Sequence, residues 1–215
     1  LRRQRQMCIR DRLYTVLALW VGALLTSVAV RTDDRSIEQN VVDPGRLTAG
    51  QKYFGRYLTF VTTGLAQSTL LMAGLIVYVG IEPAHPFLLF MAGWVSSLVF
   101  HLICYTLVLS LSNAGKAVGV LILVLQVSAA GGAYPLQLLP GWAQAISPWL
   151  PATYSIRAMR AAVFGTYGWD FWRALGSLVL FVLPFLFLGL WLRHRLHHAI
   201  GRMDEAVAQT KVMMT

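Results

Sequence analysis

The stretch Phe87 to Leu111, FLLFMAGWVSSLVFHLICYTLVLSL, contains no Asp, Glu, Lys or Arg. Because an α-helix rises about 1.5 Å per residue, a run of this length can cross a hydrocarbon core of roughly 30 Å. Similar apolar blocks lie on both sides of it. The chain of 215 residues is 57% hydrophobic and 13% charged, whereas soluble domains carry about 25% charged residues. The sequence therefore predicts an all-α fold, a polytopic transmembrane helical bundle.

We expect about five spans, separated by polar or proline-containing segments. The predicted spans are 13–30, 57–80, 87–111, 117–133 and 172–192. The second and third are joined by the tight turn Glu82–Pro86, which contains two prolines, so they should form a helical hairpin. Together the spans define a membrane domain over 13–193, and the residues 194–215 are expected to form a cytoplasmic tail.

The first twelve residues do not fit this pattern. The segment 1–12, LRRQRQMCIRDR, has no apolar core and so is neither a signal peptide nor a span. Part of it, Met7 to Arg12, resembles a translated sequencing-adapter artefact. We therefore assign no function to this tail, and we expect the chain to be truncated at its N-terminus.

Positive charges suggest an orientation, because cytoplasmic loops near spans are enriched in Lys and Arg. Beyond the first twelve residues they gather in the segment 31–56, at Lys116 and after residue 193, which are therefore expected on the cytoplasmic side. The five arginines of the segment 1–12 would lie outside in this orientation, and they carry no weight here because we set that tail apart. The segments 81–86 and 134–171 then lie outside. The net charge of +9 follows from residues between apolar blocks, where Lys and Arg face anionic lipid headgroups rather than nucleic acid.

The segment 134–160 is too apolar for an ordinary loop, yet prolines prevent it from forming one continuous span. These prolines are Pro135, Pro140, Pro148 and Pro151. A broken pair of short helices that dips partly into the membrane satisfies both observations. Because irregular backbone at membrane depth needs protein or a wet cavity around it, we expect this re-entrant segment to pack on the outer face of the bundle.

Several stretches resemble one family of membrane proteins. They are Asn113–Gln126 (NAGKAVGVLILVLQ), Gly131–Pro135 (GGAYP), Leu138–Pro140 (LLP) and Ile146–Pro151 (ISPWLP), followed by Tyr154 and Arg160. Together with Leu19–Ala23 (LWVGA), they are similar to the C-terminal membrane domain of the YhgE/Pip family. This family belongs to the type-2 ABC exporter permease superfamily, and the resemblance covers roughly residues 13–197.

The resemblance implies a multi-pass protein of the bacterial inner membrane that acts as an exporter or secretion accessory. A complete member has a further N-terminal span and a large extracellular domain. The segment 31–56 would meet a separate ATPase subunit. The expected partners are therefore the lipid bilayer, this ATPase and a second copy of the chain in a homodimer, with no nucleic acid. The alternative is a non-transporting anchor or scaffold that displays an extracellular domain to phage or to secretion machinery.

No catalytic, cofactor-binding or metal-binding motif is recognised, so we expect no enzyme activity. Ala114-Gly115-Lys116 lacks the remaining residues of a phosphate-binding loop. The histidines 194, 197 and 198 are interleaved with arginines, which favours a basic tail that binds headgroups over a metal cluster.

Four polar or charged side chains remain as candidates within the membrane domain. His101, four residues after Ser97, is either a proton relay or substrate ligand, or a histidine that donates to a carbonyl of a neighbouring helix. Gln126 has the same two interpretations, and interhelical hydrogen bonding is the commoner one. Arg157 and Arg160 share a helix face, where they either contact anionic lipid or substrate or snorkel to the interface.

Overall fold

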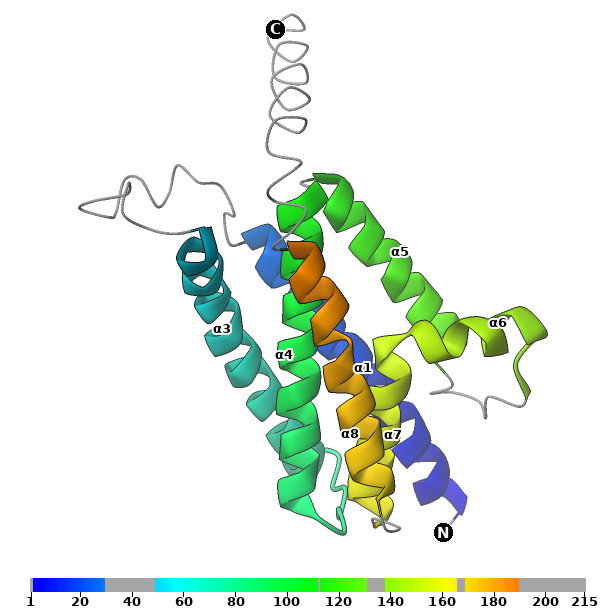
Figure 1. The fold of residues 1–215 in the computed structure, drawn as a ribbon. Coiled ribbons are helices and arrows are strands. Elements are labelled where there is room, and N and C mark those ends of the chain that lie inside the picture. Colours follow the sequence, from blue (N-terminus) through cyan, green and yellow to red (C-terminus); the bar gives the residue numbers. More distant parts are fainter. Residues whose placement is uncertain (1, 30–48, 112, 131–137, 166–168, 190–215) are drawn as a thin grey trace, which may run out of the picture.

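The computed structural model describes residues 2–29, 49–111, 113–130, 138–165 and 169–189. Within these ranges all regular elements are helices, which confirms the predicted all-α fold (Figure 1). The elements are α1 (Arg2–Ala29), α3 (Ala49–Val77), α4 (Pro86–Leu111), α5 (Asn113–Ala129), α6 (Gly141–Ile146), the 3-10 helix η3 (Ser147–Trp149), α7 (Pro151–Phe164) and α8 (Asp170–Leu180).

Four of the described helices are long and apolar enough to cross a membrane. Their spans are Arg12–Ala29, Tyr57–Val77, Pro86–Leu111 and Asp170–Gly189. The last of these continues beyond α8 after a turn at Phe181. The predicted span 117–133 corresponds to α5, an apolar helix of 17 residues, and the residues 131–133 lie outside the described part. The expected set of about five therefore consists of four full-length helices and one shorter helix.

Helix α1 begins eleven residues before the predicted first span. The tail 1–12, which we set apart on composition, is helical from Arg2 and continuous with the first span. Its sequence contains neither Pro nor Gly, so nothing in it ends a helix that starts in the apolar block.

Helix α4 lies at the centre of the bundle and contacts α1, α3, α5, α7 and α8. Within its span 61% of the residues are buried, compared with 28% in the span of α3 and 22% in the span of α8. A helix that is apolar on every side is suited to such a central position. The outer helices keep one face free for lipid.

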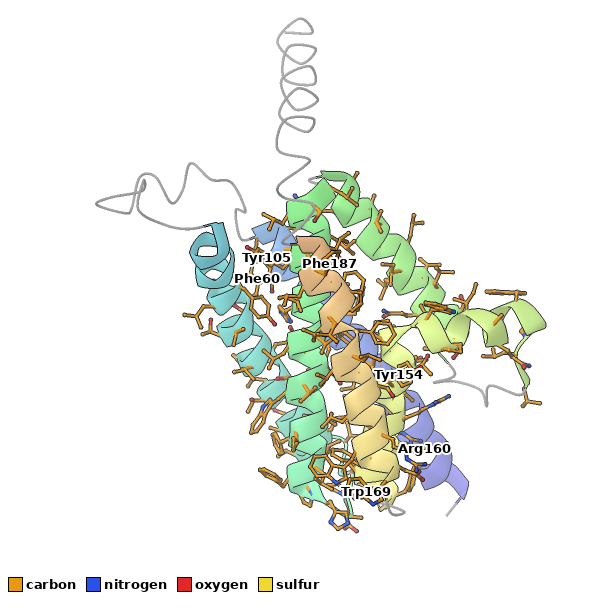
Figure 2. The ribbon with its side chains drawn as sticks, viewed as in Figure 1. Phe60, Tyr105, Tyr154, Arg160, Trp169 and Phe187 are labelled. Carbon is orange, nitrogen blue, oxygen red and sulfur yellow. The ribbon has the colours of Figure 1, made fainter. Side chains whose placement is uncertain are left out.

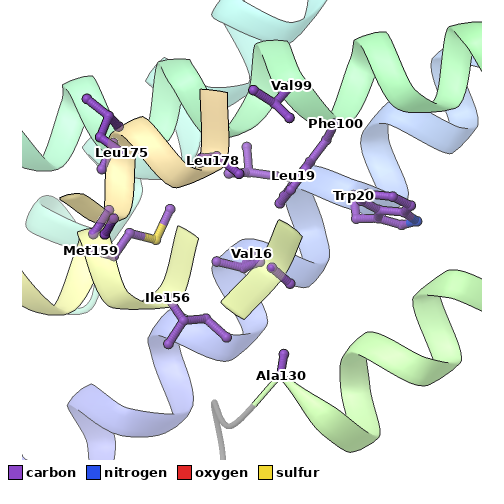
Figure 3. Close-up of a cluster of buried hydrophobic side chains, with 14 of the residues drawn as sticks. Val16, Leu19, Trp20, Val99, Phe100, Ala130, Ile156, Met159, Leu175 and Leu178 are labelled. Atoms are coloured by element: carbon purple, nitrogen blue, oxygen red, sulfur yellow. The ribbon is translucent and has the colours of Figure 1, made fainter. Parts of the chain in front are cut away.

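The core forms where α1, α4, α7 and α8 converge (Figure 3). Trp20 of α1 is fully buried, meets the Phe100 ring edge-on at 5.1 Å between centroids, and donates from Nε1 to the Gly119 carbonyl at 3.2 Å. Met159 of α7 and Leu178 of α8 are also fully buried. One apolar cluster thus holds α7 and α8 against the central helix.

The predicted break is present between α6 and α7. Leu150 has an extended backbone, with φ −98° and ψ 122°, and Pro151 is the first residue of α7. A residue that precedes proline is disfavoured in helical conformation, whereas proline itself suits the first helical position. In Figure 1, α5 approaches from the end where α4 terminates, α6 extends to the side, and α7 runs on toward the end where α8 begins.

Candidate functional site

A cavity of about 580 Å³ lies between α7 and α8, and basic side chains line it. We call it the arginine cavity. Arg157 and Arg160 come from α7, whereas Arg173 and Asp170 come from α8. Three arginines against one aspartate leave a formal excess of two positive charges on its lining. Such a surface attracts an anion.

Helical spacing explains how these charges come together. Arg157 and Arg160 are three residues apart on an exposed face of α7, while Ala158 and Met159 between them are fully buried in the core. Asp170 and Arg173 are likewise three apart in the first turn of α8. Because residues at this spacing share a helix face, each helix directs a pair of charged side chains toward the cavity. Figure 2 shows Arg160 and Trp169 toward the same end of the bundle.

Tyr154 joins the arginine cavity to the helix break. Its hydroxyl donates to the Pro148 carbonyl at 3.0 Å, and its ring lies 5.6 Å from Arg157 Cζ. The break is further fixed by Thr153, whose hydroxyl donates to the Ser147 carbonyl at 2.8 Å. The irregular segment therefore positions one wall of the cavity.

A fourth arginine reaches the same region from α1. Arg12 is buried, and its Cζ lies 4.8 Å from the centre of the Phe164 ring, which lines the cavity. Arg12 was not among the sequence candidates, because no function was assigned to the tail that contains it, and Arg173 was not singled out either. The spacing of Arg173 from Asp170 was a usable local signal, whereas nothing local connects Arg12 with α7.

His101 lies elsewhere, in the contact between α3 and α4. It is fully buried, and its Nδ1 donates to the Ser97 carbonyl of its own helix at 2.8 Å. The Ser97 hydroxyl donates to the Gly64 carbonyl of α3 at 2.8 Å. The carbonyl on the neighbouring helix is therefore reached by Ser97, not by His101. Phe60 and Tyr105, which pack in this region, lie toward the opposite end of the bundle from Trp169 (Figure 2).

The remaining candidates have separate positions. Gln126 of α5 is fully buried, and neither amide atom has a hydrogen-bond partner in the described part of the chain. Pro148 is exposed in η3, Pro151 is buried at the start of α7, and Pro135 lies outside the described residues. The segment 31–48 and the histidines 194, 197 and 198 also lie outside them. Of the sequence candidates, only Arg157 and Arg160 line the arginine cavity.

The similarity to known proteins extends over nearly the whole described bundle. Residues 13–191 match the model of a family described as ABC-2 family transporter protein. The uncharacterized protein YhgE of Bacillus subtilis (strain 168) is 31% identical over 165 residues, which make up 76% of this chain. The matched region spans only 20% of the length of that relative. The resemblance to the YhgE/Pip membrane domain is confirmed.

Proposed function

The chain belongs to the ABC-2 family of transporter proteins, and we propose that it serves as the permease-like subunit of an export system in the bacterial inner membrane. The observation that carries this proposal is the helix break at Leu150–Pro151 beside the arginine cavity. Irregular backbone within a membrane needs a cavity or protein around it. Ionisable groups there commonly mark the path of a substrate.

The positive-inside pattern supports an orientation for this permease. The end of α4 and the start of α5 lie near Lys116, and the segment 31–56 comprises the connection from α1 to α3 together with the first eight residues of α3. We assign that end of the bundle to the cytoplasm. The arginine cavity, near the connection between α7 and α8, is then directed toward the outer face, and we assign the predicted re-entrant segment 134–160 to the same side.

Energy for export would come from a separate ATPase. The Gly115-Lys116 pair is not part of a phosphate-binding loop, because the first glycine of that motif and the Ser or Thr after its lysine are both absent. The segment 31–56 is the proposed docking site. In the sequence a partial apolar face near its end is formed by Leu47, Tyr53, Phe54 and the adjoining Tyr57, and an interfacial helix that docks or lies on lipid has this character.

The test is affinity purification of the full-length protein from its native membrane, followed by mass spectrometry and an ATPase assay. The double variant Tyr53→Ser/Phe54→Ser would be compared with Gln51→Ser, a polar change in the same segment. Export is supported if an ATPase co-purifies with the parent protein and with Gln51→Ser but is lost from the double variant. Equal recovery of only envelope or secretion proteins from all three would instead favour the non-transporting scaffold.

A further inference from the structure

We propose that the arginine cavity binds the headgroup of an anionic phospholipid. Arginine suits this ligand because its planar guanidinium can donate two parallel hydrogen bonds to phosphate oxygens. Arg157 and Arg160 of α7 and Arg173 of α8 surround one space, and Asp170 is the single acidic residue among the lining side chains. A volume of about 580 Å³ falls within the usual range for small-molecule sites, roughly 300–1,000 Å³.

Aromatic contacts distinguish this arrangement from arginines that merely snorkel. A snorkelling side chain extends toward the headgroup layer and keeps its charged end in water. Here the Arg157 guanidinium lies over the Tyr154 ring, and the Arg12 guanidinium lies over the Phe164 ring. Both rings line the cavity. Cation–π contacts of this kind hold a guanidinium in place and keep it positively charged, so the charge of Arg157 stays directed at the cavity that it lines.

The surface next to the cavity selects a lipid over a free phosphate ion. On α8, Arg173 and Ser177 line the cavity, and Leu180 follows at helical spacing on the same face with 62% of its surface exposed. Trp169 and Trp172 are exposed at the start of this helix, as expected for residues at a membrane interface. A ligand with an anionic head and apolar chains would meet the arginines and the leucine together.

This inference rests on the proposed function only in taking the cavity to face the outer leaflet of a membrane. Binding of a lipid requires neither an ATPase nor transport. Failure to capture an ATPase would therefore leave the lipid site intact, and failure to bind lipid would leave the permease assignment intact.

The experiment is lipid binding to the full chain in nanodiscs of phosphatidylcholine, titrated with phosphatidylglycerol and followed by native mass spectrometry. Arg157→Gln/Arg160→Gln should weaken phosphatidylglycerol binding roughly tenfold or more, because two charge-assisted contacts are lost. The control Lys116→Gln removes a charge at the opposite end of the bundle and should change affinity less than about twofold. The conservative variant Arg157→Lys/Arg160→Lys keeps the charge and should bind with intermediate affinity.

Three results would overturn the proposal. One is parent-like binding by Arg157→Gln/Arg160→Gln in a preparation with unchanged helix content. A second is equal weakening by Lys116→Gln, which would mean that net charge alone attracts the lipid. A third is displacement of phosphatidylglycerol by millimolar inorganic phosphate, which would identify a site for free anions instead.

Discussion

The contact between α3 and α4 and the contact between α7 and α8 use polar side chains in opposite ways. In the first, the Tyr57 hydroxyl donates to the Leu98 carbonyl at 2.9 Å, and the Ser97 hydroxyl donates to the Gly64 carbonyl. In the second, Arg157 and Arg160 are exposed along a cavity. Polar groups that bond across helices stabilise the bundle, whereas charged groups directed at open space are available to a ligand.

Gly64 explains why α3 and α4 pack closely, with no open space between them at this position. A Cβ built on this glycine would lie 2.9 Å from both Ser97 Oγ and His101 Nδ1. Small residues let two membrane helices approach until side chains on one reach the backbone of the other. Between α7 and α8, by contrast, the large residues Met159 and Leu178 fill the core side, and the opposite side stays open. If the two contacts are independent, a substitution in one of them should leave the other unchanged.

The largest effect is expected from Gly64→Leu. The added side chain must displace His101 and Ser97 and disrupt the hydrogen bond to the Gly64 carbonyl, so we expect a loss of about 2–3 kcal/mol in the free energy of unfolding. Reversible unfolding in mixed micelles would measure it. Gly74→Leu is the matched control, because it lies on the same helix with no neighbouring atom within 4 Å of its Cβ position. Equal destabilisation by both variants would contradict close packing at Gly64.

A smaller effect is expected at the helix break. Pro148→Ala/Pro151→Ala should lower stability by about 1–2 kcal/mol, because each proline restricts the unfolded chain at a position that accepts it. The freed backbone should also change the rate at which cysteines introduced between residues 138 and 160 react with a thiol reagent. Pro140→Ala, before α6, serves as the control. Labelling rates that match the parent would show that these prolines do not maintain the break.

Gln67→Leu should cost less still, about 0.6–1 kcal/mol, the usual range for one interhelical hydrogen bond in a membrane protein. The Gln67 Nε2 donates to the Ala18 carbonyl at 2.8 Å and so joins α3 to α1. Unfolding measured as for Gly64→Leu would test this value. Ser128→Ala, which removes an exposed hydroxyl bonded within its own helix, should be neutral by comparison. A neutral result for Gln67→Leu would mean that the contact contributes no net stability.

The smallest change in stability is expected for Arg157→Gln/Arg160→Gln, less than about 0.5 kcal/mol, because both side chains are exposed. This variant is the one expected to lose lipid affinity. A thermal or denaturant midpoint in detergent, where no phospholipid is present, would measure stability alone. A loss above 2 kcal/mol would mean that these arginines hold α7 in place and would remove the contrast between the two contacts.

Sequence reasoning located the helices and the break because both follow from local chemistry. The apolar run Phe87–Leu111 has the length of a span, and Pro148 and Pro151 interrupt the next apolar segment wherever they lie in the fold. The shared face of Arg157 and Arg160 also follows from helical spacing. The side of the arginine cavity that α7 contributes was therefore predictable.

The contributions of α8 and α1 to the arginine cavity depended on tertiary structure. Helix α4 is apolar on all sides, so its sequence does not indicate which face meets α3, α7 or α8. Consequently, sequence spacing could not show that Arg12 and Arg173 lie near α7. It could not show either that Ser97 is the residue that donates to α3. The sequence by itself determined which segments are helical, because hydrophobic length and proline geometry are local properties. The packing of helix faces decided which charges share a cavity, because that choice depends on contacts between residues distant in the chain.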